Sequence, residues 1–246
     1  NPGCLEVMTY NTKLLGPSPR SPDMENKARA QEMASRIAGI DCDVVLLQEV
    51  HVDRMAKILL EGPVHYSVDH PTGERRGGLL NKHNYREGKK RRGLLTISRW
   101  PIVDHKTMDF DTNPGGFRTR GVLYVAIDKQ GMKYHIFNTH LWWDKHNGEH
   151  CPGYRKDQRD RTKQVLELNE FIGEQDIPRD EPIIIAGDFN FGGPYDPRFE
   201  RCYTEDLKHY RYFNDEVLRA TDLFEYPPNE RTIDHIFYRN AHINHC

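Results

Sequence analysis

No apolar run in this sequence approaches the ~18–20 residues that a membrane-spanning helix needs, so no transmembrane segment is expected. The sequence also lacks an excess of charge of either sign, because 35 basic and 37 acidic side chains leave a formal net charge of -2. The chain as a whole therefore has no electrostatic attraction for nucleic acid or anionic lipid, and such recognition would require a local patch. With 37% hydrophobic and 29% charged residues, the 246-residue chain can bury a sizeable core.

Cysteine is scarce and scattered, which excludes a clustered zinc motif and a small scaffold held by disulfides. Because the chain has five cysteines, at least one thiol is unpaired or paired between chains, and the sequence does not assign any pairing. The chain begins with Asn1 rather than Met, as expected after signal-peptide cleavage, but also for an excised domain. Secretion is the expectation, with a cytoplasmic location as the alternative. The cysteines are Cys4, Cys42, Cys151, Cys202 and Cys246.

Short β-rich runs alternate with helical stretches, and neither an internal repeat nor a Ser/Gly-rich linker divides the chain. Amphipathic spacing predicts helices over Glu25–Ile40 and Asp157–Gly173. This pattern predicts one layered α/β domain spanning residues 1–246. The predicted strands are Leu5–Tyr10, Val44–Val50, Leu94–Ser98, Val122–Ile127, Tyr134–Thr139, Ile183–Ala186 and Thr232–Tyr238.

One segment differs from the rest by its charge. Between Thr72 and Arg92, eight Lys or Arg side chains stand against two acidic ones, a local net charge of +6. Such a segment is either a solvated loop or a contact for phosphate, nucleic acid or anionic lipid.

Polar side chains follow or end four of the predicted strands. Asn11 follows the first, Glu49 lies at the end of the apolar run Val45-Leu46-Leu47-Gln48-Glu49, and His140 follows Phe137-Asn138-Thr139. Asp188 and Asn190 come after Ile184-Ile185-Ala186-Gly187. Because the ends of buried strands meet at the edge of a sheet, we expect these side chains to lie close together.

The residue types at these positions suit phosphate chemistry. Amide and carboxylate oxygens beside a single His suit a hard cation such as Mg²⁺, and no Cys or His cluster offers a zinc site instead. His140 could donate a proton or stabilise a developing negative charge. Asp188 and Asn190 point the same way if the chain is extended there, so both could face one phosphate. Each motif alone is a weak signal, but together the four predict a divalent-metal-dependent phosphodiesterase.

These motifs resemble the endonuclease/exonuclease/phosphatase superfamily, whose members have the DNase I-like fold. Their order and approximate spacing agree over most of the chain, which implies a four-layered α-β-β-α sandwich. The matching pieces are Met-Thr-Tyr-Asn at Met8–Asn11, Asp43–Val50, Gly93–Ile102, Asn138–Leu141, Ala186–Asn190 and Thr232–Tyr238.

The resemblance also implies a role for each candidate residue. Glu49 is implied to be the main ligand of Mg²⁺ or another divalent cation, with Asn11 beside it. His140 is implied to bind phosphate or to act as the general acid. Asp188 and Asn190 are implied to orient the nucleophile and stabilise the transition state, and Asp234 is implied to lie near the same pocket.

Within the superfamily, the sequence is similar to sphingomyelinase C enzymes, chiefly over Arg161-Thr162-x-Gln164, Phe171-Ile172, Ile177-Pro178 and Glu181. This similarity implies hydrolysis of a phospholipid headgroup ester, with peripheral membrane contact. A DNase I-like nuclease acting on nucleic acid is the first alternative, because the Thr72–Arg92 segment is basic. A non-enzymatic protein that binds metal and phosphate is the second.

The sequence departs from the family near its C-terminus. The catalytic His of the family's Ser-Asp-His motif is not found, and neither is the final strand after it. Asp234-His235 matches an earlier strand, where alternation would turn His235 away from a pocket that Asp234 faces. The base could therefore lie in a missing tail, or His235, His242 or His245 could replace it, or the protein could have lost turnover.

Two adjacent tryptophans, Trp142 and Trp143, directly follow the His140-Leu141 pair. They could contact a membrane interface, where Trp is favoured. Alternatively, one packs on the sheet and the other lines the site.

Overall fold

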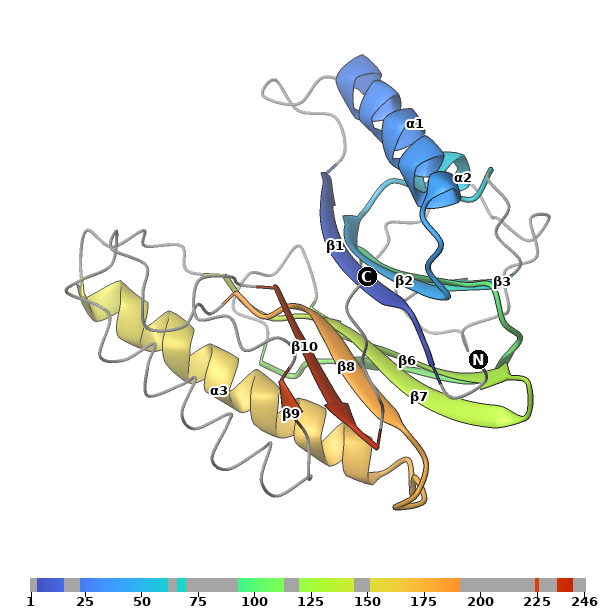
Figure 1. Cartoon of the computed structure of the whole chain (residues 1–246). Coiled ribbons are helices and arrows are strands. Elements are labelled where there is room, and N and C mark those ends of the chain that lie inside the picture. The colour runs from blue at the N-terminus through green and yellow to red at the C-terminus, as the bar shows by residue number, and fades with distance from the viewer. Residues whose placement is uncertain are drawn as a thin grey trace.

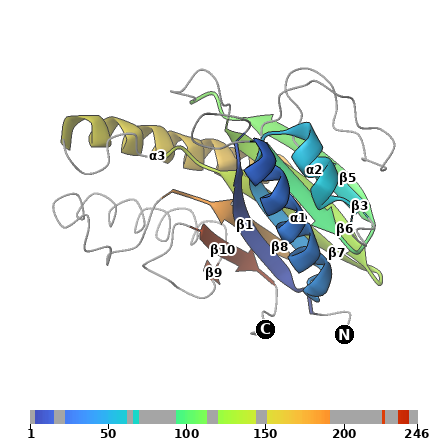
Figure 2. The same ribbon diagram turned by 90° about the horizontal axis from the view of Figure 1, so that it is seen from above.

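The computed structural model describes residues 4–15, 23–61, 66–69, 93–112, 120–143, 151–190, 224–225 and 234–240. Two β-sheets pack face to face, two helices cover the outer face of one sheet, and a long helix covers the outer face of the other (Figure 1). Seen from above, α1 and α2 lie over the strands, and α3 extends to the left (Figure 2). The expected α-β-β-α sandwich is confirmed.

The first sheet has the strand order β1-β2-β4-β3. Strand β1 (Val7–Leu14) runs parallel to β2 (Val44–Val50), and β2 runs antiparallel to β4 (Gly93–Ser98), which pairs with β3 (Tyr66–Asp69). Its outer face is covered by α1 (Asp23–Gly39) and α2 (Asp53–Leu59).

The second sheet has the order β5-β6-β7-β8-β10-β9. Helix α3 (Cys151–Gly173) connects the parallel strands β7 and β8, as such a crossover requires, and covers the outer face of this sheet. The strand bounds are β5 (Ile102–Asp109), β6 (Gly121–Lys129), β7 (Met132–His140), β8 (Ile183–Asp188), β9 (Phe224–Glu225) and β10 (Asp234–Arg239).

Successive residues of the central strands enter different cores. Val44 and Leu46 face the second sheet, whereas Val45 and Leu47 pack under α1 and α2. In β8, Ile184 lies between the sheets. Its neighbours Ile183 and Ile185 pack under α3. Both faces of these strands are buried, which explains why they are apolar throughout rather than alternating.

The predicted strands and helices are present, with shifted ends. Strand β1 extends to Leu14, so Asn11 lies within the strand rather than after it. Sequence reasoning missed β3, α2, β5 and β9. In strand β5 only Ile102 is buried and Met108 is partly buried, while the other side chains are polar or exposed, so the strand resembles a loop in sequence. Within the described ranges no strand follows β10, and the basic Thr72–Arg92 segment lies outside those ranges.

Candidate active site

Strand register gathers the candidate residues at one end of the sandwich. His140, the last residue of β7, pairs with Asp188, the last residue of β8. On the other side of β8, Asp234 also pairs with Asp188. From the facing sheet, Asn11 Nδ2 donates a 2.8 Å hydrogen bond to Asp188 Oδ2. Asp188 is therefore the centre of the cluster.

Glu49 joins this cluster through a β-bulge. The register of β2 shifts between Leu47 and Val50, and Glu49 has a left-handed backbone with φ of 59°. Simple alternation would put Glu49 on the helix-covered face with Leu47. The bulge redirects the side chain instead, so Glu49 Oε1 lies 3.9 Å from His140 Nε2.

The Asp188 carboxylate is buried, with 3% of the residue exposed. Burial raises the pKa of Asp188, and this effect outweighs hydrogen bonds from Asn11 and from the backbone of Asn190. The nearby charges of Arg120 and His235 also lower the pKa, but less. His140 Nε2 lies 3.5 Å from Asp188 Oδ2. The cluster therefore places an imidazole within ion-pair distance of a buried carboxyl.

Asn190 is held by a turn rather than by an extended segment. Its backbone N–H donates to Asp188 Oδ1 at 2.9 Å, its φ is 53°, and its Nδ2 donates to the carbonyl oxygen of Leu141 at 2.9 Å. The expectation that extended spacing aligns Asp188 and Asn190 is wrong, because an Asx turn sets their orientation instead. Leu141 N–H donates in turn to the Asp188 carbonyl oxygen at 2.9 Å, which ties residue 141 to the cluster.

Asp234 and His235 lie on opposite faces of β10, as alternation predicts. Burial, and secondly the charge of Asp188, raise the pKa of Asp234 to about 6. His235 is 2% exposed, stacks on Phe237 and meets Phe189 edge-on, both of which belong to the core under α3. This position is unsuited to a base that faces the pocket. The tail residues His242 and His245 lie outside the described ranges.

The cluster offers hard oxygen donors for a divalent cation. In the described part of the chain, no three His, Cys, Asp or Glu side chains form a metal-binding group. Mg²⁺ does not require one, because it binds through one or two carboxylates and keeps several waters. The Glu49 side chain is 14% exposed. Among the described hydrogen bonds, Asn11 Oδ1 accepts one, from the Lys13 N–H at 3.0 Å. The donor set fits Mg²⁺.

Sequence reasoning missed a buried amide network behind the cluster. Gln48 Nε2 donates to Asn138 Oδ1 at 2.9 Å and to Thr9 Oγ1 at 3.0 Å, so side chains of the two sheets are joined. Asn138 Nδ2 donates to the carbonyl oxygens of Leu47 and Leu95 at 3.2 Å. The available signal was a polar residue beside each candidate in an otherwise apolar strand. Buried Arg120 was also missed as a charge acting on Asp188.

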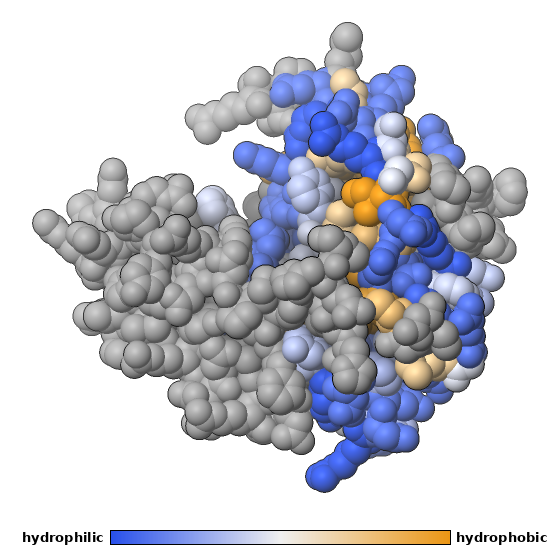
Figure 3. All heavy atoms as spheres, in the orientation of Figure 1, coloured by the Kyte–Doolittle hydropathy of each residue, from blue (hydrophilic) through white to orange (hydrophobic). Residues whose placement is uncertain are grey.

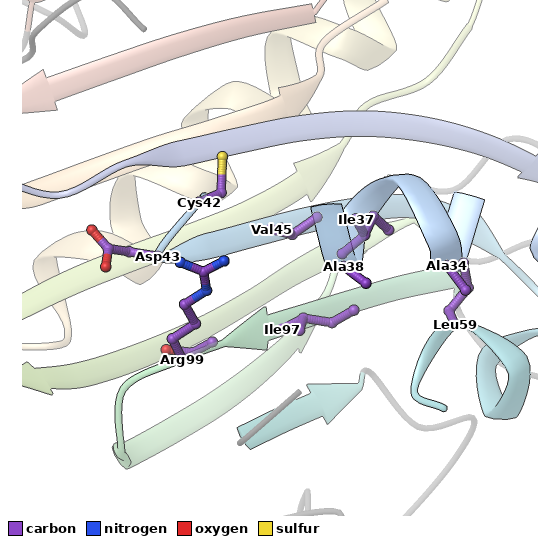
Figure 4. Close-up of a pocket in the computed structure, with 10 residues that line it drawn as sticks. Ala34, Ile37, Ala38, Cys42, Asp43, Val45, Leu59, Ile97 and Arg99 are labelled. Atoms are coloured by element: carbon purple, nitrogen blue, oxygen red, sulfur yellow. The ribbon is translucent and has the colours of Figure 1, made fainter. Parts of the chain in front are cut away.

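Two hollows elsewhere contain none of these residues. A small cavity between α1 and the outer face of the first sheet is lined by Ile37, Val45 and Ile97 (Figure 4). A larger groove of about 530 Å³ is lined by Met8, Tyr10 and one face of α1. Hydrophobic colour gathers on the surface where α1 passes over the first sheet (Figure 3). Neither hollow coincides with the cluster around Asp188.

Comparison with known proteins gives curated relatives named sphingomyelinase C. The proteins from Leptospira interrogans and Bacillus cereus are each 28% identical, over 198 and 199 residues, in both cases 76% of this chain. The chain spans about a third to just over half the length of these relatives, 34% and 56% respectively.

Solved structures share the fold. The crystal structure of SmcL matches with a TM-score of 0.64 at 23% identity, covering 99% of this chain and 86% of that one. Beta toxin from Staphylococcus aureus, solved with bound magnesium ions, matches with a TM-score of 0.64 at 19% identity, covering 98% and 86%. D. rerio TDP2 complexed with a single-strand DNA product matches with a TM-score of 0.58 at 19% identity, covering 96% and 84%.

Residues 8–246, nearly the whole chain, match the Endonuclease/Exonuclease/phosphatase family. Together with the two-sheet sandwich, this match shows that the chain belongs to that family.

Proposed function

We propose that the protein is a Mg²⁺-dependent phosphodiesterase that hydrolyses a phospholipid headgroup ester of the sphingomyelin type. The observation that carries the proposal is the convergence of Asn11, His140 and Asp234 on the buried Asp188 carboxyl, with Glu49 beside His140. The names of the curated relatives support the lipid substrate.

In this proposal, Glu49 and Asn11 hold the cation, which would neutralise phosphate charge when bound. His140 binds a phosphate oxygen or protonates the leaving oxygen through Nε2, the nitrogen directed at Asp188 and Glu49. Asp188, whose second oxygen is fixed by the Asn190 N–H, orients the attacking water together with Asn190. Asp234 orients the histidine that serves as base. The burial of His235 beside Phe189 and Phe237 argues against His235 in that role.

The test is hydrolysis of sphingomyelin vesicles and of plasmid DNA, assayed side by side with Mg²⁺ and with EDTA. Release of phosphocholine that EDTA abolishes is the expected result. Glu49→Gln and His140→Ala should each lower the rate by about 10²-fold or more while keeping the wild-type circular dichroism spectrum. Glu174→Gln, at an exposed position after α3, and His105→Ala, on β5, are the matched controls and should retain full activity.

A nuclease is the second candidate, supported by the shared fold with a protein complexed with a DNA product. Metal-dependent nicking of plasmid without phosphocholine release would replace the lipid proposal with this one. In that case, binding should weaken steeply as salt rises, because phosphate contacts release counterions. Metal binding without turnover on either substrate would favour the non-enzymatic alternative.

A further inference from the structure

The two tryptophans that follow the site have opposite environments. Trp142 is 3% exposed, whereas Trp143 is 46% exposed. Trp100, the third tryptophan of the chain, is half-buried in the bend between β4 and β5. Trp143 is therefore the most exposed of the three tryptophans, and it lies three residues after His140.

Described contacts fix the segment that carries Trp143 on both sides. Toward the site, the Leu141 N–H donates to the carbonyl oxygen of Asp188, and the Leu141 carbonyl oxygen accepts from Asn190 Nδ2, each at 2.9 Å. The exposed indole is thus attached within two residues of the Asp188 cluster.

Toward the helix, the backbone of Trp142 is bound by two buried side chains of α3. Its N–H donates to Gln164 Oε1 at 2.7 Å, and its carbonyl oxygen accepts from Arg161 Nη1 at 3.4 Å. Gln164 and Arg161 are 0% and 1% exposed. The backbone of Trp142 is therefore held in place, and the residue after it presents an exposed tryptophan side chain beside the Asp188 cluster.

We infer that Trp143 contacts the lipid–water interface and holds the pocket against a membrane that contains the substrate, an inference that rests on the proposed function. An indole combines a large apolar area with one N–H donor and is favoured at the headgroup level of a bilayer. Attraction by overall charge is not available, since the formal net charge is -2. An aromatic contact next to His140 would bind the protein to the membrane surface at the place where the phosphodiester must enter the site.

The test separates adsorption from chemistry. Trp143→Ala should bind vesicles of phosphatidylcholine and sphingomyelin about tenfold more weakly in EDTA and should hydrolyse vesicle sphingomyelin correspondingly more slowly. Hydrolysis of a soluble phosphocholine ester should stay at the wild-type rate. Brominated phosphatidylcholine should quench wild-type tryptophan fluorescence, and Trp143→Phe, which keeps an aromatic ring for folding, should lose that quenching.

Val103→Ser is the matched control, because Val103 is 53% exposed at the end of β5 that pairs with Ile127, away from the site. It should leave vesicle binding and both hydrolysis rates unchanged. An equal loss on the soluble and vesicle substrates would overturn the inference, as would wild-type protein that brominated lipid fails to quench. Quenching without hydrolysis of either substrate would support the inference while rejecting the proposed function.

Discussion

Asn11 and Asp188, 177 residues apart in the chain, are joined by a 2.8 Å hydrogen bond between the two sheets. The amide of Asn11 donates to an oxygen of Asp188, and this bond lowers the pKa of a carboxyl that burial raises. The pair therefore links the packing of the sandwich to the ionisation of the central acid.

Asn11→Ala should raise the pKa of Asp188 further and lower phosphodiesterase activity by about 10- to 100-fold, as loss of a partner that orients a site residue does. Unfolding free energy should fall by about 1–3 kcal/mol, because a buried acceptor loses its donor. Steady-state kinetics and urea denaturation measure both effects. The control is Asn240→Ala, whose amide donates to the Arg179 carbonyl oxygen at an exposed site and should cost little. Full activity in Asn11→Ala would remove Asn11 from the site.

Gly187 is the position where a side chain is least tolerated near the cluster. Its φ is 151°, and a Cβ there would lie 1.9 Å from the carbonyl oxygen of Thr139 on the adjacent strand. Gly187→Ala must therefore separate β7 from β8 next to His140 and Asp188. We expect a loss of about 3 kcal/mol or more in unfolding free energy, together with loss of activity.

Gly173→Ala is the control for that substitution. A Cβ at Gly173, the last residue of α3, meets no atom within 4 Å. The unfolding free energy of Gly173→Ala should therefore be unchanged or raised by about 0.5–1 kcal/mol. Thermal denaturation followed by circular dichroism gives both values, and similar melting temperatures for the two variants would contradict the close approach at Gly187.

Polar residues at the ends of apolar strands were sufficient to predict that Asn11, Glu49, His140 and Asp188 lie close together, whereas Asp234 was predicted only from the family resemblance. The sequence was not sufficient to predict the backbone conformation that turns the Glu49 side chain towards His140. The alternation of β2 puts Glu49 on the wrong face, and the bulge with a left-handed backbone that corrects this leaves no distinctive residue in the sequence. Glycine would mark such a conformation, but Glu49 adopts it without one.

The polar edge strand and the buried amides escaped prediction for related reasons. Strand β5 lies at the edge of the second sheet, next to β6, and its residues Asp104 and Lys106 are exposed. The strand therefore carries only a weak hydrophobic pattern in the sequence. Gln48 and Asn138 look like ordinary polar residues in sequence, yet both are 0% exposed and bond to each other across the sheets. Their role depends on a pairing 90 residues apart, which single-sequence patterns do not contain.

Asp43 holds the end of the sandwich where β1 and β2 begin. Its carboxylate accepts from Lys129 Nζ and from Trp100 Nε1, each at 2.6 Å, and from the Glu6 N–H at 2.9 Å. Burial alone would raise the pKa of Asp43, but these bonds outweigh it and hold the pKa below the ordinary 3.8. A depressed acid pKa contributes stability above the unfolded-state value, and this contribution is lost as pH falls through the folded-state value.

Asp43→Asn should therefore cost about 3 kcal/mol of unfolding free energy at pH 7, because it leaves the ammonium of Lys129 buried without its counterion. The difference from wild type should start to shrink as pH falls below the ordinary pKa of 3.8, because the unfolded chain then binds a proton at Asp43 before the folded protein does. Urea denaturation between pH 3 and 7 measures it. Asp41→Asn, which removes an exposed pair with Arg99, should cost less than about 1 kcal/mol at any pH. Equal costs for the two variants would contradict a buried Lys129–Asp43 pair.

Asp234 pairs with Asp188 across β10 and β8, and the negative charge of Asp188 makes the Asp234 carboxyl harder to ionise. Burial is the larger cause of the pKa of about 6 at Asp234, and the charge of Asp188 is the second. Asp188→Asn removes only the second cause, so the pKa of Asp234 should fall below about 6 but stay above the ordinary 3.8. Carboxyl carbon NMR titration in EDTA measures this shift directly.

The same substitution should change how stability depends on pH. Because the folded-state pKa of Asp234 is raised, folding retains a proton that the unfolded chain loses, and stability falls as pH rises from 3.8 towards 6. In urea denaturation without metal, the unfolding free energy of Asp188→Asn should decrease less over this pH range than that of the wild type. Asp104→Asn, on the distant strand β5, should change neither measurement. If Asp188→Asn leaves the pKa of Asp234 unchanged, the two carboxyls do not share one pocket, and Asp234 does not belong to the site.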